Sequence, residues 1–180
     1  MIAACRRIAA RSIPDLSLDI FGSGAPKSFL DARRAVRKAG MEERIRLKGA
    51  VPHGRVQELV NRYAAFVLAA RRETYGMVHV EALLAGVPIL WSRDRGIDGL
   101  FDGLEVGCRC DPSSAENIAA GIVRLVRDES TLKQRIARLQ REDAFRHVRR
   151  AAIAQRYREI VRRAIAAPSQ SLSPISVGMR

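Results

Sequence analysis

Aromatic residues are scarce in this 180-residue sequence, at 5% of the total, although 47% of the residues are hydrophobic. A core of Ala, Leu, Ile and Val is therefore expected, and side chains for stacking nucleic-acid bases are few. No RNA- or DNA-reading signature occurs either, so we expect no nucleic-acid partner. The sequence also lacks an apolar run long enough to span a bilayer. These absences favour one globular domain of ordinary size.

Cysteine and acidic residues are the other scarce classes. Cys5, Cys108 and Cys110 cannot all pair, and no secretory signal precedes them, so a reducing cytoplasm is the simplest setting. Cys108-Arg-Cys110 has no matching His or Cys cluster, which favours buried inert thiols over a metal site. Lys and Arg outnumber Asp and Glu by 32 to 19, for a formal net charge of +13. This charge suits nucleic acid, anionic lipid or a phosphorylated ligand, and alone does not choose among them.

Residues 64–91 carry the most informative pattern. The apolar run 64–70 predicts a buried strand, Arg71 begins a polar turn, and a helix follows that ends at Gly86. Residues 87–91 predict a second buried strand directly after it. This order is a βαβ unit, whose turn lies at the carboxyl ends of the strands, where ligands bind in such sheets.

Two carboxylates flank the start of this predicted helix. Glu73 lies in the turn and Glu81 lies 81 − 73 = 8 positions later, a rise of about 12 Å along a helix axis. That span resembles the separation of the two sugars in a nucleotide-sugar. Residues 75–78 are expected to form the first helical turn, whose unpaired N–H groups suit a phosphate, and Gly76 would let an anion approach the backbone. A helix-start acid and a solvated mid-helix Glu remain the alternative interpretation.

The surrounding residues resemble a known family. Glu73-Thr-Tyr-Gly-Met-Val-His-Val-Glu81-Ala-Leu-Leu-Ala-Gly-Val-Pro looks like the Glu-x7-Glu signature of retaining glycosyltransferases with the GT-B architecture, of the family 4 or group 1 type. Further matches, in family order, are Leu18-Asp-Ile-Phe-Gly-Ser-Gly-Ala-Pro26, Arg46-Leu-Lys-Gly-Ala-Val-Pro-His53, Gly96-Ile-Asp-Gly-Leu-Phe-Asp-Gly103 and Asp111-Pro112. They resemble only the carboxyl-terminal, nucleotide-sugar-binding half of such an enzyme.

The resemblance implies an α/β fold with a Rossmann-like doubly wound parallel sheet over residues 1–166, followed by a disordered tail at 167–180. By the family pattern, a strand and a glycine-containing loop precede the helix predicted for residues 1–11, and that loop usually supplies an Arg and a Lys to the diphosphate. We therefore expect the sheet to lack its first strand and to contain a gap between two unpaired edges. A second chain, or the chain's own residues 175–177, would have to fill the gap.

The resemblance also implies transfer of a hexose from a nucleoside-diphosphate sugar with retention of configuration. Glu73 is the expected catalytic residue, binding the donor sugar, and Glu81 would accept hydrogen bonds from the ribose. The other expected donor-binding residues are Gly22, Gly24, Val51, Thr74, Tyr75, Gly76, Met77 and Val78. No metal or other cofactor is expected, because helix amides can stabilise the diphosphate and no Asp-x-Asp motif occurs.

Several features keep alternatives open. Gly22-Ser-Gly24 suits either a ligand-facing turn or a tight strand-to-helix connection, while His53 and His79 suit capping, packing or surface positions better than catalysis. The segment Arg95-Gly-Ile-Asp-Gly99 departs from the paired glycine and Pro-Glu of many relatives, which puts its donor-sugar contacts in doubt.

The expected partners are a nucleotide-sugar and an amino-terminal acceptor-binding domain or second chain, without which little turnover is expected. The competing hypothesis is a non-catalytic basic α/β module that docks on an anionic membrane or a partner protein through the helices of residues 124–163. Contact with the inner membrane face and homo-oligomer formation stay open, as do the base, sugar and acceptor.

Overall fold

The structure is a computed structural model that describes residues 1–11 and 13–166. The chain divides into two compact units, residues 1–142 and 143–180, and each is described by itself. The tail predicted at 167–180, including the candidate strand at 175–177, lies outside the described residues.

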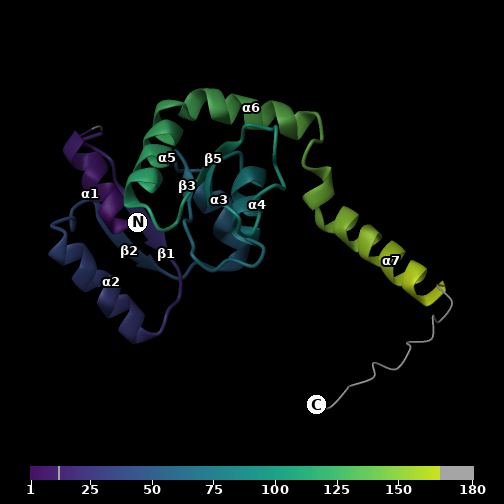
Figure 1. Cartoon of the computed structure of the whole chain (residues 1–180), viewed down its shortest axis with the longest axis horizontal. Coiled ribbons are helices and arrows are strands. Elements are labelled where there is room, and N and C mark those ends of the chain that lie inside the picture. Colours follow the sequence, from purple (N-terminus) through teal and green to yellow (C-terminus); the bar gives the residue numbers. More distant parts are fainter. Residues whose placement is uncertain (12, 167–180) are drawn as a thin grey trace, which may run out of the picture. The chain divides into compact units, whose positions relative to one another are not determined.

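The first unit alternates helices and strands, as the sequence predicts for an α/β fold. Its elements, in order, are α1 (Ile2–Arg11), β1 (Leu18–Phe21), α2 (Pro26–Lys38), β2 (Ile45–Gly49), the 3-10 turn η1 (His53–Arg55), α3 (Val56–Val60), β3 (Phe66–Val67), α4 (Met77–Leu84), β4 (Ile89–Ser92), β5 (Gly107–Cys110), α5 (Ala115–Arg127) and α6 (Glu129–Arg141) (Figure 1). The strand predicted over residues 64–70 is reduced to the two residues of β3, which pair with β4.

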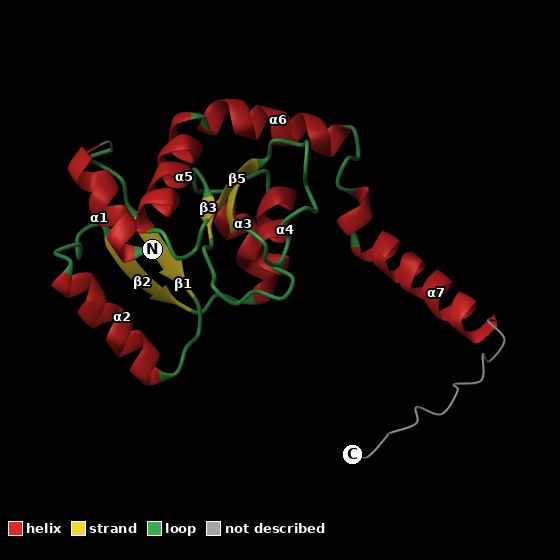
Figure 2. Ribbon diagram, in the orientation of Figure 1, coloured by secondary structure: helices red, strands yellow, loops and turns green. Residues whose placement is uncertain are grey.

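The five strands of residues 1–11 and 13–166 form two separate parallel sheets (Figure 2). β1 pairs with β2, and β3, β4 and β5 pair in that order. The predicted gap is therefore present: within the described residues, β1 and β3 each have a neighbouring strand on one side only.

Helix α1 contributes to the cores of both sheets. Ala4 and Ile8, one helical turn apart, pack in a cluster with Leu90 of β4 and Ile122 of α5. Cys5 lies in a second cluster with residues of α2 and β2. Since no strand of the described residues joins the two sheets, these apolar contacts of α1 link their cores.

The second unit contains the 3-10 turn η2 (Arg146–Val148) and the helix α7 (Arg150–Ala166). Five large apolar side chains of α7 are exposed, namely Ile153, Tyr157, Ile160, Val161 and Ile165. None of the helices in the described part of the chain has the length and apolar character needed to traverse a membrane.

Candidate functional site

The Glu73 carboxylate folds back onto its own loop. Its Oε1 accepts hydrogen bonds from the backbone N–H groups of Thr74, at 3.0 Å, and Tyr75, at 3.3 Å. The loop follows β3 and reaches the carboxyl edge of its sheet, as the βαβ pattern predicts. The side chain of Tyr75 is exposed beside it. Glu73 is thus fixed at the sheet edge where a ligand would bind.

Helix α4 begins at Met77, two residues later than predicted. Gly76 is its N-cap residue and has a left-handed conformation, with φ of 84°, so Tyr75 and Gly76 precede the helix. No side chain caps this end of the helix. The backbone N–H of His79 donates to the carbonyl oxygen of Gly76 at 2.9 Å. The N–H groups of Met77 and Val78 therefore lie at the N-terminus of α4 without a hydrogen-bond partner inside the helix.

The late start of α4 corrects the geometry expected for the two carboxylates. Only the four steps from Met77 to Glu81 are helical, so they contribute about 6 Å of axial rise instead of about 12 Å. The rest of the separation runs through the loop from Glu73 to Gly76. The physical reason is the left-handed backbone of Gly76, which interrupts the helical path.

Gly76 has a packing role that the sequence did not indicate. A Cβ on Gly76 would lie 2.8 Å from Nδ1 of His79 and 3.3 Å from Cγ2 of Ile97. Together with the positive φ, these contacts explain a glycine here without reference to a ligand. The close approach of an anion to this backbone remains a prediction.

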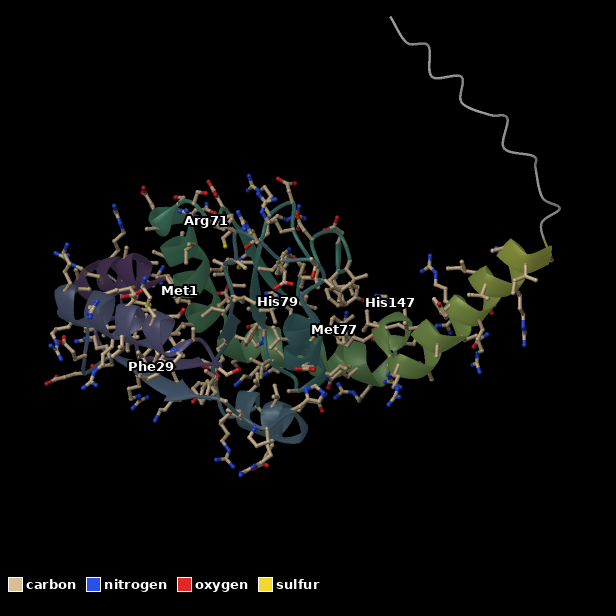
Figure 3. The ribbon with its side chains drawn as sticks, turned by 90° about the horizontal axis from the view of Figure 1, so that it is seen from below. Met1, Phe29, Arg71, Met77, His79 and His147 are labelled. Atoms are coloured by element: carbon tan, nitrogen blue, oxygen red, sulfur yellow. The ribbon has the colours of Figure 1, made fainter. Side chains whose placement is uncertain are left out.

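His79 is a packed core residue, which confirms one of the predicted interpretations. Its ring is 2% exposed and meets the ring of Phe66 edge to face, with centroids 5.3 Å apart. Figure 3 marks the position of His79. Nδ1 lies 3.3 Å from the Gly76 carbonyl oxygen, and Nε2 has no hydrogen-bond partner within the described residues. Burial lowers the pKa of His79 although the Gly76 carbonyl acts in the opposite direction. His79 supports the loop and is not placed to act on a ligand.

Glu81 lies in the middle of α4 and is mostly covered. Its side chain is 17% exposed, and Oε1 lies 3.7 Å from Nδ1 of His53, whose own side chain is 87% exposed. The loop after β2 therefore reaches the α4 carboxylate, a contact that separate motifs could not reveal. A ribose at Glu81 would also meet His53.

The carboxyl end of α4 is held by two amide side chains. Asn61 Nδ2 donates to Ala85 O at 2.7 Å, and Gln140 Nε2 donates to the carbonyls of Leu83, at 2.8 Å, and Leu84, at 3.1 Å. These bonds satisfy carbonyls that have no partner within the helix. They fix the position of the helix that carries Glu81.

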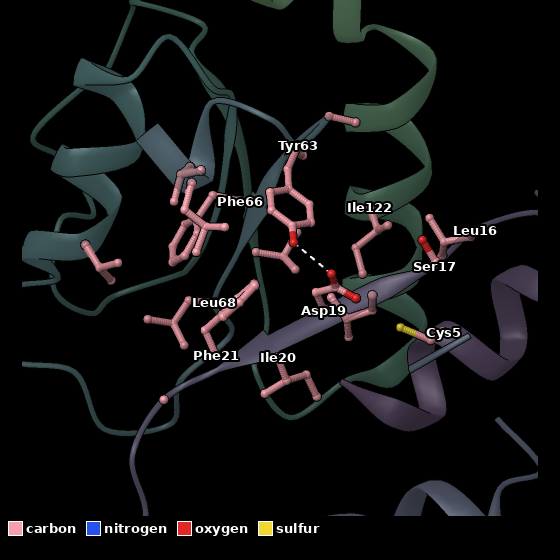
Figure 4. A pocket seen from close by; sticks show the side chains of 18 of the residues that line it. Cys5, Leu16, Ser17, Asp19, Ile20, Phe21, Tyr63, Phe66, Leu68 and Ile122 are labelled. Carbon is pink, nitrogen blue, oxygen red and sulfur yellow. Dashed lines mark hydrogen bonds between the residues drawn. The ribbon is translucent and has the colours of Figure 1, made fainter. Parts of the chain in front are cut away.

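Three of the predicted donor-binding residues meet at one cavity. Gly22, Val51 and Val78 belong to the lining of a cavity of about 440 Å³. Ile20 of β1 and Phe66 of β3 line it as well (Figure 4). Gly22 donates its N–H to the carbonyl oxygen of Gly49 in β2 at 2.9 Å, which extends the pairing of β1 and β2 by one residue. Gly24 is exposed, just ahead of α2, and does not belong to this lining.

The remaining predicted residues lie outside that lining. They form the loop and helix start already described, and comprise Glu73, Thr74, Tyr75, Gly76, Met77 and Glu81. Val78 lies in the first turn of α4 and also lines the cavity, so the cavity reaches the N-terminus of this helix.

The segment after β4, whose role the sequence left in doubt, supports the Glu73 loop. A Cβ on Gly96, which has φ of 56°, would lie 2.7 Å from Cγ of Glu73 and 3.1 Å from the carbonyl oxygen of Tyr75. Asp98 organises this segment by accepting hydrogen bonds from Trp91 Nε1, at 2.8 Å, and from the backbone N–H of Asp94, at 2.7 Å. Gly96 and Asp98 were missed as site residues.

Asp98 is a mostly buried carboxylate that stays ionised. Its side chain is 10% exposed, and burial alone would raise its pKa. The hydrogen bonds from Trp91 and Asp94, with the nearby Arg109, more than offset this and lower the pKa of Asp98. The charge therefore helps to fix the segment at neutral pH.

The cysteines are buried free thiols, as predicted. Burial raises the pKa of Cys5, Cys108 and Cys110, and that of Cys110 reaches about 11. Such thiols are protonated and unreactive at neutral pH. Among the described residues, no group of three or more His, Cys, Asp or Glu side chains is arranged to hold a metal ion.

Solved structures show the class of fold. Sucrose-phosphate synthase from Thermosynechococcus elongatus superposes with a TM-score of 0.77 at 22% identity, over 93% of this chain and 43% of that one. Anabaena HepE, solved in complex with UDP, gives 0.74 at 18% identity over 89% and 43%. The fold is that of the Rossmann-like domain of GT-B glycosyltransferases.

Sequence comparisons define the family. The profile of the family "Glycosyl transferases group 1" matches residues 1–142. Glycogen synthase of Mycobacterium tuberculosis is 32% identical over 141 residues, 78% of this chain and 33% of that protein. N-acetyl-alpha-D-glucosaminyl L-malate synthase of Bacillus anthracis is 25% identical over 146 residues, 81% of this chain and 37% of that protein. The chain belongs to the group 1 glycosyltransferases, and it spans about a third of the length of these relatives.

Proposed function

We propose that this chain binds the donor of a retaining glycosyltransferase, a nucleoside-diphosphate sugar, at the edge formed by the Glu73 loop and α4. The observation that carries the proposal is the placement of Glu73 and Glu81 on either side of an uncapped helix start in a member of this family. The structure of Anabaena HepE, which shares the fold, was solved with UDP.

Each part of the site has a distinct role in this proposal. The N–H groups of Met77 and Val78 bind the diphosphate, because they are unpaired and lie at the positive end of the α4 dipole. Glu81 binds the ribose hydroxyls. Glu73 binds the hexose through Oε2, since Oε1 is occupied by Thr74 and Tyr75.

Two arginines next to the Glu73 loop supply positive charge. Arg71 and Arg72 are exposed and form no ion pair within the described residues. A diphosphate that arrives at this edge would meet both guanidinium groups, which bind phosphate oxygens in a bidentate manner. No metal is required for this arrangement to stabilise the leaving diphosphate.

Calorimetric titration with UDP-, GDP- and ADP-glucose tests the donor site. We expect one of the three to bind weakly, and Glu81→Ala to lower its affinity about tenfold through the lost ribose hydrogen bonds. Glu43→Ala is the matched control, because Glu43 is exposed in the turn before β2. Unchanged affinity in Glu81→Ala would refute the ribose assignment.

Transfer activity separates donor binding from catalysis. We expect the isolated chain to bind the donor and to transfer no sugar at a measurable rate. Restoration of transfer by an acceptor-binding domain supplied from a relative would support the donor-half role. Rapid transfer by the chain alone would contradict it.

A second candidate function rests on α7. This helix carries five exposed apolar side chains and five arginines, namely Ile153, Tyr157, Ile160, Val161 and Ile165 with Arg150, Arg156, Arg158, Arg162 and Arg163. Exposed apolar and basic side chains on one helix suit the surface of an anionic membrane at the cytoplasmic face. Co-sedimentation with phosphatidylserine vesicles that is lost in about 0.5 M salt would support this function. At that ionic strength the Debye length is only a few ångströms, so the attraction between the arginines and the lipid headgroups is screened.

A further inference from the structure

A second groove lies between α2 and β2, apart from the residues of the candidate donor site. It has a volume of about 450 Å³, and Figure 1 shows α2 next to β2. The α2 wall carries Phe29, Arg33, Val36 and Arg37, and β2 with the turn before it forms the other wall. Within the described residues β2 is an edge strand, because β1 is its one neighbour.

The backbone of β2 presents hydrogen-bonding groups on the side away from β1. Leu18 of β1 is in register with Ile45 and donates to the carbonyl oxygen of Arg44 at 2.8 Å. Because backbone groups alternate in direction along a strand, those of Ile45 and Leu47 face away from β1. The N–H of Ile45 donates to the carbonyl oxygen of Met41 at 2.8 Å. The carbonyl of Ile45 and both groups of Leu47 are therefore open to a further strand.

The residues on the α2 wall have the spacing of side chains along a strand. Phe29, Arg33 and Arg37 follow one another at intervals of four residues. They therefore share one face of the helix and lie about 6 Å apart along its axis. Alternate side chains of an extended strand point to one side and lie about 6.6 Å apart. An extended chain beside β2 can thus place every second side chain next to one of these three residues.

The charge of this surface is basic. Arg33 and Arg37 are exposed and form no ion pair within the described residues. Glu42 is the acidic residue of the lining. Residues 26–48 contain eight Lys and Arg and three Asp and Glu, for a net charge of 8 − 3 = +5. Guanidinium groups bind carboxylates in a bidentate manner, so an occupant should carry carboxylates next to Arg33 and Arg37.

The third position on the α2 wall is apolar. Phe29 lies in the first turn of α2 and is 41% exposed. As the crossover helix between two parallel strands, α2 runs back along the sheet, so Phe29 lies toward the carboxyl end of β2. An apolar side chain of the occupant would cover the Phe29 ring at that end.

Two other occupants fit this surface less well. A second copy of the chain that paired with β2 about a two-fold axis at Leu47 would place Arg46 opposite Lys48, and like charges directly opposite each other are destabilising. A lipid surface would satisfy the arginines but offers no strand for the backbone groups of Leu47 and Ile45. A peptide in extended conformation satisfies both the charges and the strand edge.

We propose that the groove between α2 and β2 binds an extended acidic segment of a partner protein, which adds to the sheet as a strand next to β2. Its backbone pairs with Ile45 and Leu47, and its alternate side chains are a carboxylate at Arg37, a carboxylate at Arg33 and an apolar group at Phe29. In this mode of recognition, main-chain hydrogen bonds supply affinity and the alternate side chains supply specificity. Binding here does not require the donor site, because neither α2 nor β2 carries Glu73 or Glu81.

Two labelled peptides test the groove by fluorescence anisotropy with the full chain. The first, acetyl-Glu-Thr-Glu-Thr-Leu-Thr-amide, suits a strand parallel to β2, and the second, acetyl-Thr-Leu-Thr-Glu-Thr-Glu-amide, suits an antiparallel one. We expect one of them to bind with a dissociation constant on the order of 100 μM. The same peptide with Lys in place of Glu should not bind measurably.

Variants of α2 identify the binding face. Arg33→Gln and Arg37→Gln should each weaken binding of the acidic peptide about tenfold, the effect of a lost hydrogen bond between charged groups. Arg34→Gln is the matched control, because Arg34 is exposed on the same helix but lies outside the groove lining. It should leave the affinity within about twofold of the unsubstituted chain.

Amide hydrogen exchange distinguishes an added strand from adsorption by charge alone. The N–H of Leu47 faces the groove, and its exchange should slow about tenfold when the free peptide is at ten times its dissociation constant. The N–H of Leu18, which already donates to Arg44, is the internal reference and should not change.

Several outcomes would overturn the proposal. Failure of both acidic peptides to bind would exclude the site, and equal weakening by Arg33→Gln and Arg34→Gln would reduce it to general charge attraction. Binding without protection of Leu47 would mean that no strand is added. Protection of Leu47 in a dimer without peptide would assign the edge to a second copy of the chain. Capture by phosphatidylserine vesicles that is lost in Arg33→Gln, with Leu47 unprotected, would assign the surface to a membrane.

Discussion

The replacement Gly96→Ala tests whether the segment after β4 holds the Glu73 loop in place. At φ of 56°, a residue with a Cβ costs about 1–2 kcal/mol. The new methyl group would also lie 2.7 Å from Glu73 Cγ and 3.1 Å from Tyr75 O, so the two loops must separate. Overpacking of this kind costs about 1–3 kcal/mol more. We expect a total loss of roughly 2–5 kcal/mol in the free energy of unfolding.

Gly99→Ala is the matched control for the backbone cost. Gly99 has φ of 87°, but a Cβ there would meet nothing within 4 Å. Its replacement should therefore cost only about 1–2 kcal/mol. Urea unfolding can be followed by the fluorescence of Trp91, the single tryptophan, which is 7% exposed and donates to Asp98. Equal losses in the two variants would refute the contact between Gly96 and the Glu73 loop.

A double-mutant cycle then identifies the partner of the methyl group. Glu73→Ala removes the Cγ atom at 2.7 Å and leaves the Tyr75 carbonyl at 3.1 Å. The cost of Gly96→Ala should therefore fall, but not vanish, in the Glu73→Ala background. An unchanged cost would mean that the strain lies in the backbone alone.

Three further predictions concern single positions. Burial lowers the pKa of His79, so below about pH 6.5 the unfolded chain binds a proton that the folded chain does not. The free energy of unfolding should therefore fall by about 1 kcal/mol as the pH is lowered from 7.5 to 5.5. His79→Gln should flatten this dependence of the free energy of unfolding on pH. Ser114 caps α5 by accepting a backbone N–H at 3.1 Å, so Ser114→Ala should cost about 1 kcal/mol in urea unfolding, whereas Ser113→Ala should cost little. A Cβ on Gly107 would clash with the carbonyl oxygen of Ile89, so Gly107→Ala should abolish the β4–β5 pairing and the cooperative thermal transition seen by circular dichroism.

The repeating patterns of the sequence were sufficient for most of the fold. The helix predicted for residues 1–11 is α1, and its apolar Ile2, Cys5 and Ile8 recur at helical spacing, a feature that depends only on positions within one helix. The separation of the described strands into two sheets was also predicted, because the order of elements in a doubly wound sheet fixes which strand lies in its middle.

The parts of the site that the sequence did not reveal depend on contacts between distant residues. The Asp19–Tyr63 bond joins residues 44 positions apart, and nothing in either local pattern indicates it. Asp98 belongs to a polar segment in which an exposed side chain is the ordinary expectation, yet three neighbours hold it as a buried charge. The left-handed turn at Gly76 also escaped prediction, since glycine suits many conformations and only the packing on His79 selects this one.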